Sequence, residues 1–207
     1  MKEHKFIIKR GISDRNERQL ILNEKLMSFE DKDYIYDAFT TFQSDEIIAF
    51  RYGIKWISIF GYVFQIFIKN VDNKQIKIDF ATYFHRNKSN YFENYQRILN
   101  ALWELYFLNI SNEFIQKFQN ETEFGIANVF FNATGISYKS GVMNSTEIEI
   151  PWEKIRTFNY QRHFVIAHSD NQGKISKQFS YLDDWNVSVL YSVIRTILQE
   201  KGIESYD

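Results

Sequence analysis

The sequence predicts a mainly β protein of the α+β class, built from two similar units that each combine an antiparallel, bent sheet with a C-terminal helix. Three observations lead to this prediction. Two segments alternate apolar and polar residues, part of the chain repeats itself, and an amphipathic segment follows each copy of the repeat. The 207 residues, 44% of them hydrophobic and 18% aromatic, are enough for two packed cores.

The alternating segments predict half-buried antiparallel strands. In FRYGIKW, residues 50–56, every second residue is apolar, and in IEIPWEK, residues 148–154, the isoleucines and the tryptophan alternate with a glutamate and a proline. Successive side chains of a strand point to opposite faces, so each segment presents one apolar face. Because Pro151 has no N–H for a ladder hydrogen bond, we expect its strand at a sheet edge or at a bend.

The internal repeat connects the two segments. A displacement of 98 positions gives six identities, namely Ile57 and Ile155, Phe60 and Phe158, Tyr62 and Tyr160, Ile68 and Ile166, Asp72 and Asp170, and Asn73 and Asn171. The same displacement places FRYGIKW on IEIPWEK, and a displacement four positions larger places Phe29 on Phe131. The chain therefore predicts a duplicated unit of about a hundred residues.

An uncharged run, KWISIFGYVFQIFIK at residues 55–69, raises the question of a membrane segment. Its thirteen uncharged residues are too few to cross a bilayer as a helix, which needs about 20. Its repeat partner, RTFNYQRHFVIA at residues 156–167, carries charged side chains. Since Gly61 marks a turn or bulge, we interpret the run as two consecutive core strands.

Two amphipathic helices are predicted after the strands. One covers residues 89–107 with a stripe of Tyr91, Tyr95, Ile98, Leu102 and Leu105. The other covers residues 183–202 with a stripe of Val187, Leu190, Ile194 and Ile197. Each helix has one apolar face, and the bent sheet before it is the simplest surface against which to bury that face.

The elements suggest a division into three parts. Residues 1–24 form an N-terminal arm with a short helix in SDRNERQLILNEKL, residues 25–110 form the first unit, and residues 111–207 form the second. Another short helix is predicted in SNEFIQKFQN, between the copies. No Gly/Ser-rich or Pro-rich linker separates them.

A meander of strands closed by one C-terminal helix resembles the pleckstrin-homology-like (PH-like) barrel. The second copy is similar to bacterial members of that superfamily through FFNATGISYKSG and EIEIPWEKI. The resemblance covers roughly residues 25–108 and 121–199, and it implies two tandem PH-like barrels that act as binding or assembly modules. Phosphoinositide-binding members place Lys and Arg in the loop after the first strand. The loops matched here, FEDKDY and FNATGI, are acidic and uncharged, so phosphoinositide is not an expected ligand.

Composition argues against several classes of protein. The 25 basic and 26 acidic residues are balanced, so the chain lacks the basic character of a nucleic-acid binder. The absence of cysteine excludes disulfides and thiolate metal sites. His163 and His168 fall on opposite faces of one strand, so no metal or other cofactor is expected. The N-terminus lacks the apolar core of a signal peptide, which predicts a cytoplasmic protein without stable membrane association.

Two functional hypotheses remain. The first is a non-catalytic protein that acts through protein partners or self-association, at unpaired strand edges or through exposed aromatic residues. The interface candidates are Trp103, Phe107 and Tyr191. The second is a small-molecule receptor or enzyme with a cleft between the two copies. Its polar ligand-binding candidates are Arg51, Lys55, Arg162 and His163. No catalytic motif singles out a residue.

Overall fold

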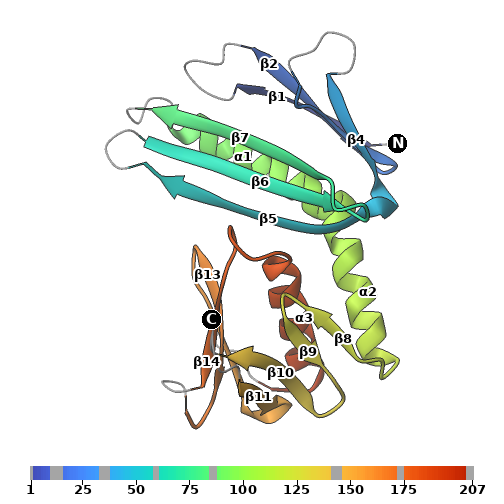
Figure 1. Cartoon of the computed structure of the whole chain (residues 1–207), viewed down its shortest axis with the longest axis vertical. Coiled ribbons are helices and arrows are strands. Elements are labelled where there is room, and N and C mark those ends of the chain that lie inside the picture. The colour runs from blue at the N-terminus through green and yellow to red at the C-terminus, as the bar shows by residue number, and fades with distance from the viewer. Residues whose placement is uncertain are drawn as a thin grey trace. The chain divides into compact units, whose positions relative to one another are not determined.

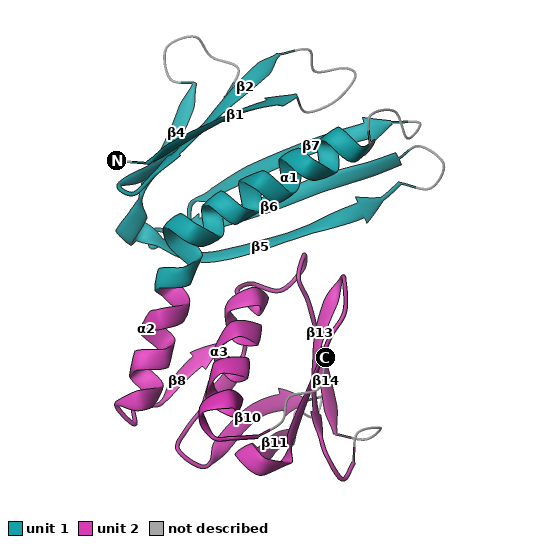
Figure 2. Ribbon diagram, turned by 180° about the vertical axis from the view of Figure 1, so that it is seen from behind, with its two compact units in different colours: residues 1–109 teal, residues 110–207 magenta. Residues whose placement is uncertain are grey.

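The computed structural model describes residues 2–9, 16–32, 38–57, 61–83, 88–140, 146–171 and 175–203 (Figure 1). The described part of the chain is mainly β, with 50% strand and 29% helix, and its four sheets are antiparallel. The chain divides into two compact units, Met1–Asn109 and Ile110–Asp207 (Figure 2). The division lies one residue from the boundary that the sequence suggests between its two units.

Unit 1 contains a four-stranded sheet, a three-stranded sheet and a helix. The first sheet has the order β1-β2-β3-β4, with β1 at Glu3–Lys9, β2 at Glu17–Asn23, β3 at Leu26–Glu30 and β4 at Phe39–Gln43. The 3₁₀ turn η1, Ser44–Glu46, leads into the second sheet. That sheet has the order β5-β6-β7, with β5 at Ile47–Trp56, β6 at Gly61–Asn70 and β7 at Gln75–Tyr83.

The first amphipathic segment is one continuous helical stretch. It consists of α1 at Lys88–Leu102, a π-helical turn at Trp103–Phe107 and α2 at Leu108–Gln119. Helix α1 lies along the three-stranded sheet (Figure 2). Tyr95 from its apolar stripe packs against Phe64 and Phe80, with ring centroids 5.2 and 6.2 Å away. Both predicted helices in this region are therefore confirmed.

Unit 2 repeats this order of elements. Its four-stranded sheet has the order β11-β10-β9-β8, with β8 at Phe124–Ile126, β9 at Val129–Phe131, β10 at Gly135–Ser140 and β11 at Thr146–Pro151. The 3₁₀ turn η4, Trp152–Lys154, leads to β12 at Ile155–Asn159, β13 at His163–His168 and β14 at Ser176–Ser180. Helix α3, Val187–Glu200, follows, and all four residues of its predicted stripe are buried.

Neither unit forms one closed barrel in the described part of the chain. In each unit a single 3₁₀ turn connects the fourth strand to the fifth, and these two strands belong to separate sheets. Among the described helices, none combines the length and the apolar composition that crossing a membrane requires.

The predicted N-terminal arm is wrong, because its residues belong to the first sheet of unit 1. Residues 17–23 form β2, which pairs with both β1 and β3. Leu20 and Leu22 are fully buried on one face of this strand. This two-residue period is that of a strand, and two ladders of hydrogen bonds override the helix that the neighbouring apolar residues suggested.

The displacement of 98 positions matches equivalent residues from the middle strand of the three-stranded sheet to the turn after it. Upstream of that strand, it pairs residues that are not equivalent. Ile68 and Ile166 lie in corresponding middle strands, and the Asn73 and Asn171 N–H groups close the same turn. Upstream, β5 and β6 have ten residues each, whereas β12 and β13 have five and six. FRYGIKW therefore belongs to the fifth strand of its unit and not to the fourth, as IEIPWEK does. Of the uncharged run, residues 55 and 56 end β5 and residues 61–69 lie in β6, while residues 58–60 lie outside the described residues.

Candidate functional site

The last strands of the two four-stranded sheets, β4 and β11, are corresponding edge strands. Each has a neighbour on one side only in the described chain, and each leads into a 3₁₀ turn. Over Phe39–Gln43 and over residues 147–151, the side chains follow the same pattern of exposed, intermediate, exposed, buried and exposed. We call the outward sides of these strands the β4 edge and the β11 edge.

An asparagine turn supports this correspondence. The Oδ1 atoms of Asn23 and Asn132 each accept hydrogen bonds from the N–H groups two and three residues later, at 2.9 to 3.0 Å. The main-chain carbonyl oxygen of each asparagine also accepts a hydrogen bond from an aromatic side chain. Tyr106 Oη donates to Asn23 at 2.8 Å, and Trp152 Nε1 donates to Asn132 at 3.2 Å. The segment FNATGI thus corresponds to LNEKLM and not to FEDKDY, residues 29–34, of which 33 and 34 lie outside the described residues.

The ladder shows which backbone groups of β4 point outward. The Ser44 N–H donates to the Lys25 carbonyl oxygen at 2.8 Å, so this pair is of the hydrogen-bonded kind. Hydrogen-bonded and non-bonded pairs alternate along an antiparallel ladder. The register then turns the N–H and C=O groups of Phe39, Thr41 and Gln43 away from β3.

The far end of the β4 edge is closed by its own turn. The Gln43 N–H donates to Glu46 Oε2 at 3.0 Å, and Val71 N–H donates to the Glu46 carbonyl oxygen at 2.9 Å. The carboxylate thereby occupies the last outward donor of the strand. Among the described residues, no hydrogen bond engages the outward backbone groups of Phe39 and Thr41.

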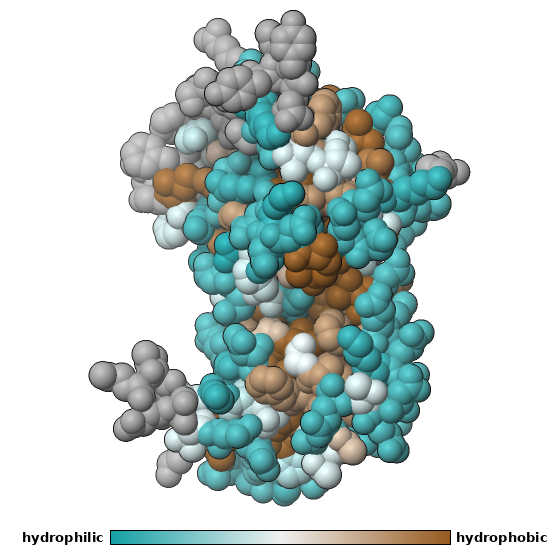
Figure 3. All heavy atoms as spheres, turned by 45° about the vertical axis from the view of Figure 1, so that its right-hand side comes forward, coloured by the Kyte–Doolittle hydropathy of each residue, from teal (hydrophilic) through white to brown (hydrophobic). Residues whose placement is uncertain are grey.

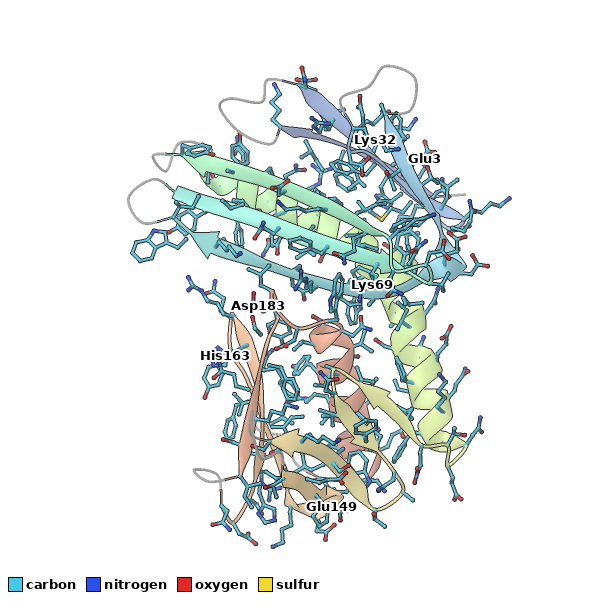
Figure 4. All side chains as sticks on the ribbon, viewed as in Figure 1. Glu3, Lys32, Lys69, Glu149, His163 and Asp183 are labelled. Carbon is cyan, nitrogen blue, oxygen red and sulfur yellow. The ribbon has the colours of Figure 1, made fainter. Side chains whose placement is uncertain are left out.

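A groove of about 600 Å³ lies beside the β4 edge. Its lining residues come from β4, from the segments that flank it and from the β6–β7 turn: Lys32, Thr40, Thr41, Phe42, Glu46, Asn70, Asp72, Lys74 and Gln75. Figure 4 labels Lys32 near this sheet. Two lysines face two carboxylates, and Lys74 Nζ lies 3.5 Å from Asp72 Oδ2. The groove is thus polar without a dominant charge.

Side-chain hydrogen bonds hold the β4 edge in place. Thr40 Oγ1 donates to Asp31 Oδ1 at 2.8 Å, and the hydroxyls of Thr41 and Ser28 lie 2.8 Å apart. Exposed apolar side chains occur on β4 and near the groove. Phe39 is 37% exposed, and Val71 in the β6–β7 turn is 53% exposed. On the face in Figure 3, hydrophobic residues likewise reach the surface in patches among hydrophilic ones.

The β11 edge carries different residues at the corresponding positions. The Trp152 N–H donates to the Thr134 carbonyl oxygen at 3.2 Å, so Glu147, Glu149 and Pro151 are the outward residues (Figure 4 labels Glu149). Proline has no N–H to donate, and charged side chains on an edge discourage a further strand. Pro151 thus lies on an edge strand, as its sequence predicts. In the described part of the chain, the β11 edge carries such protecting residues and the β4 edge does not.

The four predicted ligand-binding residues fall into two pairs in different units. Arg51 and Lys55 lie on one face of β5, where the Arg51 guanidinium is 4.6 Å from the centre of the Phe67 ring. Arg162 and His163 lie in unit 2, before and at the start of β13, and the His163 ring is 4.7 Å from that of Tyr160. A site shared by all four residues stays a prediction.

The three predicted interface aromatics pack inside their own units. Phe107 is 1% exposed and stacks on Phe50, so it offers no surface to a partner. Trp103 meets the Phe50 ring edge-on at 6.2 Å. Tyr191 meets the Phe164 ring edge-on at 5.3 Å, and it is partly exposed.

The comparisons with known proteins give no match: no family model fits the chain, and no curated protein is significantly similar to it. In the described part of the chain, no three His, Asp or Glu side chains lie close enough to hold a metal ion. The β4 edge with its groove is therefore the candidate site. Sequence reasoning missed it, although FTTFQ has no charge and TEIEIP has two glutamates and a proline.

Proposed function

We propose that this is a non-catalytic binding or assembly protein, in which the β4 edge takes an extended segment of a partner protein as an additional strand. The single observation that carries the proposal is an uncharged, unprotected edge beside a groove. Adding a strand to a sheet edge is an established mode of peptide recognition, and it needs no signature residues. This accounts for a chain without a catalytic motif.

We also propose that both units are PH-like domains. The order of four strands, three strands and a helix in each unit supports this assignment. It is a fold-level analogy, and fold alone does not assign function. The proposed function depends on the edge and its groove, whichever family name the units carry.

The energetics show what the partner must contribute. Phe39 and Thr41 offer two donors and two acceptors to a new strand. At about 1 kcal/mol net for each hydrogen bond, these four bonds supply about half of the roughly 8 kcal/mol of micromolar binding. The partner's side chains must provide the rest through the groove and through the exposed Phe39 and Val71.

Exchanging the edges tests the proposal. The variant Phe39→Glu/Thr41→Glu/Gln43→Pro gives β4 the outward residues of β11. Peptides are selected from a random displayed library against the full wild-type chain, and their affinities for both proteins are measured by fluorescence anisotropy. We expect at least tenfold weaker binding to the variant, because glutamates at the two open outward positions, 39 and 41, disfavour a new strand. Phe130→Glu, at an exposed aromatic residue of β9, is the matched control and should bind normally.

Equal affinity for the wild type and the edge-exchange variant would contradict the proposal. So would a selection that enriches no peptide against the folded chain. Sedimentation equilibrium addresses a second copy of the chain as the partner, since a dimer that dissociates in the edge-exchange variant would identify the added strand as another β4.

A further inference from the structure

A pair of core positions differs in polarity between the two units. Ile68 and Ile166 correspond, and their cross-strand neighbours on the next strand are Ile76 in unit 1 and Lys177 in unit 2. Ile76 is fully buried. Unit 2 thus places a lysine where unit 1 places a core isoleucine.

The second member of the pair lies in the four-stranded sheet. From the asparagine turn and the edge strands, Phe29 corresponds to Tyr138, because Phe29 faces Thr40 across the ladder and Tyr138 faces Ile148. Phe29 and Tyr138 are both 0% exposed. The change from unit 1 to unit 2 adds one hydroxyl to a fully buried ring.

Tyr138 and Lys177 lie together in unit 2. Lys177 Nζ is 5.1 Å from the centre of the Tyr138 ring and 5.2 Å from the centre of the Phe179 ring. The Tyr138 hydroxyl is buried, and among the described residues it has no hydrogen-bond partner. In the part of the chain that the structure describes, no carboxylate lies within ion-pair distance of Lys177.

Packing alone explains the position of Lys177, but it does not explain the buried hydroxyl of Tyr138. A lysine stem often covers aromatic rings while its ammonium group reaches water. A buried hydroxyl without a partner, however, costs free energy that the phenylalanine of unit 1 avoids. Such a group favours a partner that the described residues do not supply.

The hydrogen-bonding groups of the pair favour an acceptor as their ligand. Burial lowers the pKa of Lys177, and Asp184 is the carboxylate that partly offsets this effect. Asp184 Oδ2 already accepts the Ser180 N–H at 2.8 Å. Tyr138 and Lys177 both donate hydrogen bonds, so their common ligand must be an acceptor.

We propose that Tyr138 and Lys177 form a binding site for a small aliphatic carboxylate. The two carboxylate oxygens accept hydrogen bonds from the Tyr138 hydroxyl and the Lys177 ammonium group, and the apolar tail lies against Phe179. A single ammonium group balances the single charge of a carboxylate. A phosphate dianion would require more cations. The site lies within unit 2 and is independent of the β4 edge.

Thermal unfolding of the full chain with butyrate as the probe tests this site. Butyrate should raise the Tm in a saturable way, while butyramide and sodium chloride at equal ionic strength should not. Tyr138→Phe and Lys177→Met should each raise the butyrate concentration that gives half of the Tm increase at least tenfold. Lys139→Met, on the neighbouring exposed lysine, should leave it unchanged.

The double variant Tyr138→Phe/Lys177→Ile restores the apolar pair of unit 1, and it should have a higher Tm without ligand. It should also lose the response to butyrate. A butyrate response that persists in this variant, or that butyramide reproduces, overturns the proposal. So does the lack of any butyrate-dependent Tm change and NMR shift of the Tyr138 ring in the wild type.

Discussion

The β4 and β11 edges have the same place in their units, but they carry opposite kinds of outward residue. Their outward residues are Phe39, Thr41 and Gln43 in unit 1, and Glu147, Glu149 and Pro151 in unit 2. The buried residues between them are apolar in both strands. The core face of a duplicated strand is thus constrained by folding, while its outward positions are able to diverge towards binding or protection.

The difference extends to the strand behind each edge. Gly135 in β10 takes the position of Leu26 in β3, opposite Pro151 and Gln43 respectively. A Cβ atom at Gly135 would lie 2.2 Å from the Ile150 carbonyl oxygen. The β10 backbone therefore approaches β11 more closely than a side chain at this position permits.

The largest expected effect is that of Gly135→Ala. Because the clash is with backbone, we expect a loss of about 3 kcal/mol in the free energy of unfolding of unit 2. Urea unfolding, followed by hydrogen exchange of the β10 and β11 amides, measures it. Gly125→Ala, whose Cβ would meet the Phe130 ring at an ordinary 3.5 Å, is the control. Equal effects of the two variants would refute the close approach of β10 and β11.

Two separate proline substitutions on β4 test which of its backbone N–H groups point inward and which point outward. Thr40→Pro removes an inward N–H that pairs with β3, whereas Thr41→Pro removes an outward one. Each variant also loses one side-chain hydroxyl contact. We expect Thr40→Pro to cost about 2 kcal/mol more than Thr41→Pro in urea unfolding, because it leaves a buried carbonyl oxygen unsatisfied. The reverse order would show that the β4 edge is turned the other way.

A smaller effect is expected at the asparagine turn of unit 1. Tyr106 Oη lies 2.8 Å from the carbonyl oxygens of Asn23 and Leu26, so Tyr106→Phe should cost about 1 kcal/mol near pH 8. Burial raises the pKa of Tyr106 above its ordinary value near 10. Above that pH the unfolded chain releases a proton that the folded chain retains, so this tyrosine contributes less stability as the pH rises.

The difference in unfolding free energy between wild type and Tyr106→Phe should therefore shrink from pH 8 to pH 11. Urea unfolding at both pH values measures it. Tyr160→Phe, at a tyrosine that is 52% exposed, is the control and should not show this cost at pH 8. A difference that grows with pH would contradict the assigned role of Tyr106.

Several features of the fold could be predicted because their signals are local. The stripes through Tyr95 and Leu190 repeat at the helical period, and both segments form helices. The alternation in IEIPWEK correctly predicted a strand, which is β11, and Gly61 lies at the start of β6. The duplication was visible where the two copies have equal length, from Ile68 to Asn73.

Other features depended on which segments pair in three dimensions. The longer β5–β6 hairpin shifts the repeat, so a single displacement assigned FRYGIKW to the wrong strand. The segment of β2 was predicted as a helix, but pairing with β1 on one side and β3 on the other makes it a strand.

By itself the sequence determined a mainly β protein with two similar units and the helix that follows each, since periodicity and capping act between residues close in the chain. Only the tertiary structure decided that Phe39 and Thr41 face outward and that Tyr138 lies beside Lys177. Strand register and side-chain proximity arise from contacts between distant segments, and insertions change these contacts without altering the local pattern.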